Sequence, residues 1–126
     1  MTKAGGRTKR QKEAYWTGLR AERAAGLYLK LKGYRLLVNR YRSPVGEIDL
    51  IAKTRNTIVF IEVKKRQDLS EGLHSLHPKQ QARIVRAAEY WLSENELPLN
   101  TDCRFDMIVF SAYLLPQHIE NAFSID

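Results

Sequence analysis

The stretch Gly46-Glu47-Ile48-Asp49-Leu50-Ile51-Ala52, with Thr57-Ile58-Val59-Phe60-Ile61-Glu62-Val63-Lys64 shortly after it, decides the fold. Both runs are rich in β-branched and aliphatic residues, and the residues between them, 53–56, are polar or charged. This pattern predicts two strands, over 47–52 and 57–64, that are joined by a hairpin.

The flanking segments complete an α/β pattern. Before the pair we expect a helix from Glu13 to about Lys32, a strand over 34–41 and a turn over 43–46. After it we expect a loop over 65–77, a helix from Pro78 to about Glu96 and a strand over 103–111. The tail should hold a short strand, a turn at Pro116 and a final short element. The resulting order, α-β-β-β-α-β, predicts a mixed sheet flanked by helices.

Apolar spacing indicates which helix faces pack. The second helix carries one apolar stripe, formed by Ile84, Val85, Ala88, Trp91 and Leu92. The first helix is less decided, because apolar residues at roughly helical spacing (Trp16, Leu19, Ala24, Leu27 and Leu31) compete with a second face that holds Glu22, Ala25 and Leu29.

Length and composition describe one ordinary globular domain. The chain has 126 residues, of which 44% are hydrophobic, enough to build a core without disulfides or metal staples. Residues 1–12 include five Lys or Arg and two glycines, and we expect a disordered basic arm there, followed by a single domain over 13–126. No apolar run is long enough for a membrane span. Cys103 is the only cysteine, so an intracellular compartment fits best.

Positive charge is concentrated at the start of the chain. The net charge is +7, but residues 1–42 carry +10 and residues 67–126 carry −5. A basic third on a near-neutral body favours a polyanion as partner. The alternative is a solvated surface with an incidental basic tail.

The acidic residues of the two strands are the candidate site. Glu62 and Lys64 are two residues apart on one strand, so both project from the face that also carries Phe60. Asp49 lies among aliphatic residues, where an unpaired carboxylate is costly, and the hairpin can bring it near Glu62. Two carboxylates suit Mg²⁺ or Mn²⁺. The alternative from the residues alone is a plain ion pair on a solvated sheet face.

The sequence also resembles the YraN-like family of uncharacterised bacterial proteins. The resemblance rests on the runs 46–52 and 59–64, and on further matches across about 14–125: Ala21-Glu22, Ala24-Ala25, Gly33-Tyr34, Asn39-Arg40, Lys79, Ala88, Trp91-Leu92, Cys103-Arg104-Phe105-Asp106 and Asn121-Ala122-Phe123.

That family is similar to Holliday junction resolvases and other PD-(D/E)XK nucleases. The resemblance therefore implies a restriction-endonuclease-like core and a nuclease-like domain in the bacterial cytoplasm. It implies a catalytic set of Glu22, Asp49, Glu62 and Lys64. Asp49 and Glu62 would bind the metal together with the backbone carbonyl of Val63. Two incisions in a junction imply a symmetric homodimer.

The leading hypothesis is a divalent-metal-dependent endonuclease for branched or structured DNA, with no small-molecule cofactor and no membrane partner. Phosphates would be bound by basic side chains along the chain, namely Arg40, Arg42, Lys65, Arg66, Lys79 and Arg83. The alternatives are a non-catalytic nucleic-acid-binding module on the same fold and a structural or assembly protein.

Overall fold

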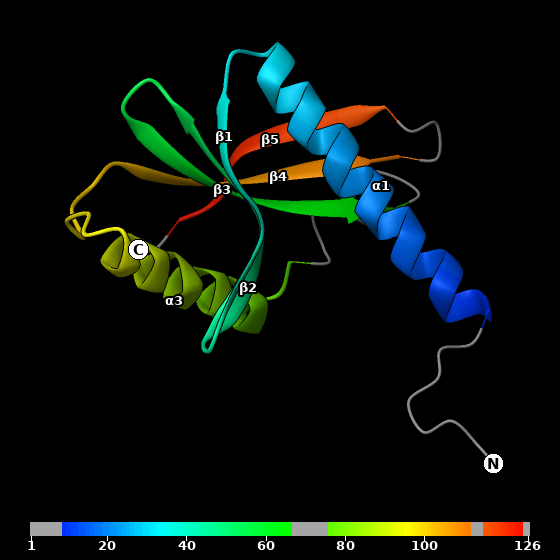
Figure 1. Cartoon of the computed structure of the whole chain (residues 1–126), viewed down its shortest axis with the longest axis horizontal. Helices are drawn as coiled ribbons and strands as arrows, with labels where there is room; N and C mark the ends of the chain where they lie inside the picture. The colour runs from blue at the N-terminus through cyan, green and yellow to red at the C-terminus, as the bar shows by residue number, and fades with distance from the viewer. Residues whose placement is uncertain (1–8, 67–75, 112–114, 125–126) are drawn as a thin grey trace.

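The fold is seen in a computed structural model that describes residues 9–66, 76–111 and 115–124. Its elements are α1 (Lys9–Leu31), β1 (Arg35–Ser43), β2 (Gly46–Thr54), β3 (Thr57–Lys65), α3 (Pro78–Glu94), β4 (Cys103–Phe110) and β5 (Pro116–Phe123). The five strands form one sheet in the order β1-β2-β3-β4-β5 (Figure 1). β3 and β4 are parallel, and the other neighbours are antiparallel. The predicted α/β class and the α-β-β-β-α-β order are confirmed.

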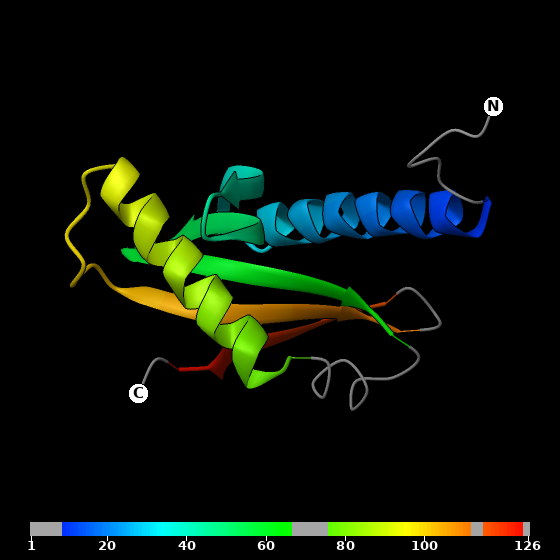
Figure 2. The same ribbon diagram turned by 90° about the horizontal axis from the view of Figure 1, so that it is seen from below.

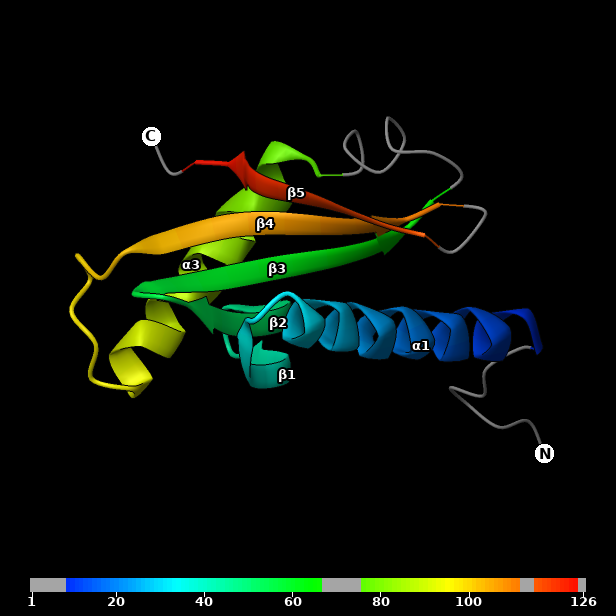
Figure 3. The ribbon, with the colours of Figure 1, turned by 90° about the horizontal axis from the view of Figure 1, so that it is seen from above.

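The two helices cover opposite faces of the sheet. α3 crosses the strands on one face (Figure 2), and α1 lies on the other (Figure 3). Alternation along β3 serves both layers: Phe60 packs on the α3 side with Trp91, whereas Val59 and Ile61 pack on the α1 side with Leu29. The hydrophobic effect thus fixes the parity of β3, and with it the face on which Glu62 must lie.

α1 packs through the smaller of its two candidate faces. Ala25 and Leu29 are fully buried, whereas Leu27 and Leu31 are 59% and 80% exposed. The reason is close approach: a Cβ added to Gly26 would lie 3.3 Å from a methyl of Leu36 in β1. The helix therefore sits on the sheet through Ala25, Gly26 and Leu29, and Leu27 and Leu31 point outward.

The ends of the chain differ from the expectation in two ways. α1 begins at Lys9, before the expected Glu13, because the intervening Lys, Arg and Gln residues are good helix formers. The expectation for the rest of the arm lies outside the described residues. In the tail, the turn expected at Pro116 is wrong, because Pro116 opens strand β5. The first position of an edge strand tolerates a residue that has no N–H.

A buried ion network ties β4 to β5. Asp106 is 1% exposed. It accepts two hydrogen bonds from Arg104, at 2.8 Å each, one from the backbone N–H of Asn121 at 2.9 Å, and contacts the Nε2 of His118 at 2.8 Å. These donors hold the pKa of Asp106 below its usual range despite its burial. The role of Asp106 is therefore structural, because its carboxylate is held by these contacts.

Among the described residues, no helix is long and apolar enough to cross a membrane.

Candidate active site

The candidate site lies where β2 and β3 part. The two strands are paired from the hairpin up to Leu50 and Ile61, and Asp49 is the next residue of β2. Its Oδ2 accepts a hydrogen bond of 2.8 Å from the backbone N–H of Val63. The carboxylate of Asp49 thus accepts a hydrogen bond from a backbone N–H of β3 that lies beyond the last residues paired with β2. The fork in the sheet places Asp49 beside the end of β3.

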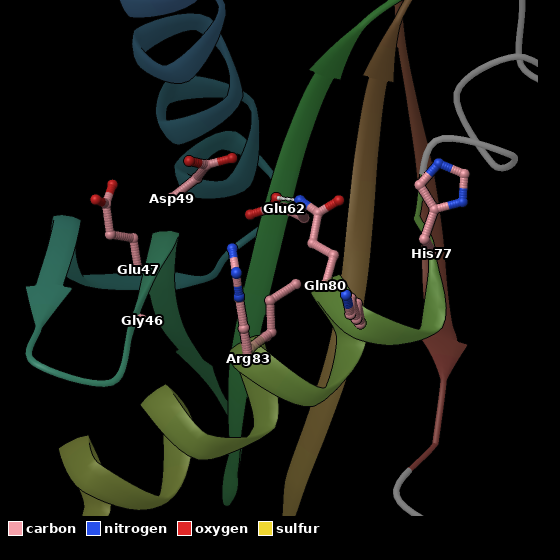
Figure 4. Close-up of a pocket in the computed structure, with 9 residues that line it drawn as sticks. Gly46, Glu47, Asp49, Glu62, His77, Gln80 and Arg83 are labelled. Carbon is pink, nitrogen blue, oxygen red and sulfur yellow. Dashed lines mark hydrogen bonds between the residues drawn. The ribbon is translucent and has the colours of Figure 1, made fainter.

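Glu62 and Lys64 lie on the α3 side of β3, as the alternation predicts. The Nζ of Lys64 is 3.6 Å from Oε2 of Glu62. The same oxygen accepts a 2.6 Å hydrogen bond from Nε2 of Gln80, in the first turn of α3 (Figure 4). Glu62 is 9% exposed, so its carboxyl is held by one cation and one amide in a nearly dry setting.

The two carboxyl groups of Asp49 and Glu62 interact directly. They are close enough to share a hydrogen bond. Burial, followed by the charge of Asp49, raises the pKa of Glu62 to about 8. Burial also raises the pKa of Asp49, although the Val63 N–H opposes this. Burial and the charge of Asp49 thus disfavour ionisation of Glu62, whereas the hydrogen bond from Glu62 favours that of Asp49. A cation bound at this pair would relieve the cost of ionising Glu62.

A third carboxylate comes from α1. Glu22 lies 3.7 Å (Oε1) from Nε of Arg40, and its Oε1 is sealed from solvent without a hydrogen-bond partner in the described structure. Burial first, and then the charge of Asp49, raise the pKa of Glu22. Arg40 belongs to β1 and has a positive backbone φ of 53°. The expected grouping of Glu22 with Asp49 is therefore present.

An open pocket of about 470 Å³ gives access to these carboxyls. Asp49 and Glu62 form one side, and Gln80 and Arg83 of α3 form another (Figure 4). Lys79 of α3 also lines the pocket. Gly46, which also lines the pocket, packs closely on α3, where an added Cβ would lie 2.9 Å from the carbonyl oxygen of Arg83. Close contact between β2 and α3 thus fixes one wall.

The remaining expected phosphate-binding residues lie around the site and not in its pocket. Arg42 is exposed on β1, with its Nε 4.0 Å from Glu47. Lys65 is exposed at the end of β3, and Arg66 follows it and donates a hydrogen bond to its carbonyl oxygen. Of the six expected cations, Lys79 and Arg83 line the pocket, and Arg40 contacts Glu22.

The carboxylates of the site fit a Mg²⁺ or Mn²⁺ ion that keeps part of its water shell better than an ion that is bound by protein groups alone. Within the described residues, no three His, Cys, Asp or Glu side chains converge closely enough to hold an ion alone. Mg²⁺ keeps several waters and is commonly bound through one or two carboxylates. Asp49 and Glu62 supply two, and Oε1 of Glu22, which is ion-paired with Arg40 but accepts no hydrogen bond in the described structure, is a further anionic acceptor nearby.

Gln80 is the site residue that the sequence analysis missed. It donates to Glu62 across a segment, 67–75, that the structure does not describe. A connecting segment of that length sets no register between β3 and α3. The one feature of the sequence that pointed to Gln80 was its position between Lys79 and Arg83, two residues that were expected to bind phosphates.

Comparison with known proteins places the chain in a family. The family model described as uncharacterised protein family UPF0102 matches residues 21–110. A UPF0102 protein of Rhodopseudomonas palustris is 44% identical over 110 residues, which cover 87% of this chain and 86% of the relative. Similar proteins of Bradyrhizobium diazoefficiens and Nitrobacter winogradskyi are 44% and 42% identical over the same length, covering 83% and 93% of the relatives.

The protein belongs to the UPF0102 family, and the resemblance to YraN-like bacterial proteins is confirmed. The printed names of these relatives assign no activity. The function must therefore be argued from the site.

Proposed function

We propose that the protein is a divalent-metal-dependent endonuclease that acts on branched or structured DNA. The observation that carries the proposal is that Asp49, Glu62 and Lys64 meet at the fork of β2 and β3, with Glu22 near enough to be influenced by the charge of Asp49. A protein that only binds nucleic acid has no use for buried carboxylates that repel phosphate. Their burial costs stability, so a function that needs them is favoured.

Each side chain has a role that its position supports. Asp49 and Glu62, with the Val63 carbonyl, would hold Mg²⁺ or Mn²⁺, which supplies an acidified water and charge neutralisation at a phosphodiester. Gln80 and the Val63 N–H fix the orientation of the two carboxylates. Lys64 places a positive charge beside Glu62, where negative charge would grow on a reacting phosphate.

The cations of α3 would position the nucleic acid. Lys79 and Arg83 line the same pocket as the carboxylates, and phosphate contacts of this kind fix register without reading sequence. Replacing both by Gln should lower the slope of log affinity against log salt by roughly 2, because each lost phosphate contact contributes about 0.9. Two incisions in a junction would need two sites, so we expect a homodimer by light scattering.

The decisive assay is cleavage of four-way, flap, single-stranded and linear DNA with Mg²⁺ or Mn²⁺. The parent should cut a branched substrate, and Asp49→Asn should not. The control is Asp102→Asn, which makes the same chemical change at an exposed acid before β4 and should cut normally. DNA binding without cleavage in either metal would make the protein a binding module instead.

A further inference from the structure

A second pocket lies at the opposite end of α3 from the carboxylates. This distal pocket, of about 490 Å³, lies between the start of β1, the end of β2 and the last turn of α3, and its lining includes Arg35, Lys53, Asn56, Trp91, Asn95 and Leu97. The β1–β2 hairpin separates it from the carboxylates, because the hairpin packs on α3 at Gly46 and again where Tyr41 donates a hydrogen bond to Glu94 (Figure 1).

Two like charges face each other at the mouth of the distal pocket. Arg35 and Lys53 are direct cross-strand partners in β1 and β2. Lys53 in turn pairs with Ile58, whose side chain packs in the core on the α3 side. Among the described residues, neither cation has an ion-pair partner, and none of the residues lining this pocket is acidic. Both residues are exposed, and like charges placed directly opposite are destabilising, so an anion bound between them would relieve their repulsion.

The helix end nearby does not explain the two cations. Cations near a helix C-terminus can satisfy its free carbonyls. Here three of the last four carbonyls already have backbone donors: the N–H of Asn95 bonds to Trp91, that of Glu96 to Ser93 and that of Leu97 to Leu92. Arg35 and Lys53 are therefore not needed to cap α3.

Trp91 also lines the distal pocket. It is 7% exposed. In the described structure the indole N–H has no hydrogen-bond partner. The N–H is still reached by solvent, because Oε1 of Glu22 is the only side-chain N or O atom of the described residues that is both sealed from solvent and without a hydrogen bond. A buried indole normally finds a partner for its N–H. The open pocket leaves room for an acceptor brought by a ligand.

We propose that the distal pocket binds a nucleoside phosphate monoester. A phosphate monoester carries about −1.5 to −2 at neutral pH, which matches the paired charges of Arg35 and Lys53, whereas a carboxylate or an internal phosphodiester carries −1. The partly buried Leu37, Val38 and Leu97 give an apolar wall for the sugar and base. The ligand is a free nucleotide or the phosphorylated end of a strand, and the two share this chemistry.

Calorimetry in metal-free buffer tests the proposal independently of any cleavage. The probes are 5′-dTMP, thymidine and inorganic phosphate. We expect saturable binding of 5′-dTMP, weaker binding of phosphate and none of thymidine. Arg35→Gln and Lys53→Gln should each weaken the affinity for 5′-dTMP on the order of tenfold, the effect of one charge-assisted hydrogen bond. The indole N–H resonance of Trp91, assigned with Trp16→Phe, should shift on binding.

The matched control is Arg55→Gln. Arg55 is exposed in the hairpin two residues from Lys53 and does not line the distal pocket, so its loss should change the affinity by less than about twofold. An equal loss in Arg55→Gln, or equal binding of thymidine or of inorganic phosphate, would overturn the proposal. So would absence of 5′-dTMP binding at about 10 mM.

Competition then identifies the source of the ligand. Displacement of 5′-dTMP by a 5′-phosphorylated oligonucleotide, and not by its 5′-hydroxyl form, would assign the pocket to strand ends. Failure of both to displace it would assign the pocket to free nucleotides.

Discussion

The carboxylate pair makes the metal-free protein less stable as the pH rises. The perturbation is Glu62→Gln, which keeps the shape of the side chain and an oxygen to accept the Gln80 hydrogen bond but removes the charge. In the parent, burial and Asp49 raise the pKa of Glu62 from 4.5 to about 8. In the unfolded chain the same group has an ordinary pKa.

The direction of the pH dependence follows from the pH at which Glu62 loses its proton in each state. At low pH Glu62 is protonated in both states and contributes no difference. As the pH rises above its ordinary pKa, the unfolded chain loses the proton first, so the free energy of unfolding falls until the pH passes about 8. At about 1.4 kcal/mol per pKa unit, the whole window corresponds to on the order of 5 kcal/mol. Glu62→Gln removes this loss.

The assay is urea unfolding from about pH 5 to about pH 9, without metal. The advantage of Glu62→Gln over the parent should grow with pH, and Mn²⁺ should narrow it by stabilising the parent alone. Glu89→Gln, at an exposed position of α3, is the control and should follow the parent. A parent and a Glu62→Gln variant whose stabilities stay parallel across this range would refute the reasoning, as would a variant less stable at high pH.

Three further substitutions test other parts of the structure. Asp106→Asn should lower the free energy of unfolding by about 3–5 kcal/mol in urea, because it breaks a buried ion pair, while Asp102→Asn should have little effect. Gln80→Leu leaves Glu62 without its amide donor, so Mn²⁺ affinity measured by calorimetry should fall about 10–100-fold with the fold intact by circular dichroism. Lys64→Met should slow DNA cleavage by about 10²–10³ and change DNA affinity far less; cleavage at the parent rate would show that the lysine has another role.

The strands were predictable because each carries its own apolar pattern. β3 alternates between two buried layers, and that alternation alone fixes Glu62 and Lys64 on one face. The stripe of α3 was predictable for the same reason, since Ile84, Trp91 and Leu92 are all buried. In both elements, one arrangement buries far more apolar surface than any other.

α1 and the tail were harder because their local signals were ambiguous. α1 has two candidate faces, and contact with β1 through Gly26 selected the smaller one. Pro116 is common in turns, but pairing with Phe110 placed it at the start of an edge strand. Neither choice is encoded within the segment itself.

The sequence by itself determined the elements, their order and the face of β3 that carries Glu62, because side-chain alternation and apolar burial are local and act on every residue of a strand. Only the tertiary structure decided that β2 leaves β3 after Leu50, so that Asp49 bonds to the Val63 N–H. It also decided that Glu22 and Gln80 converge on this fork from opposite faces of the sheet. Such contacts depend on where separate elements pack, and no spacing along the chain records that.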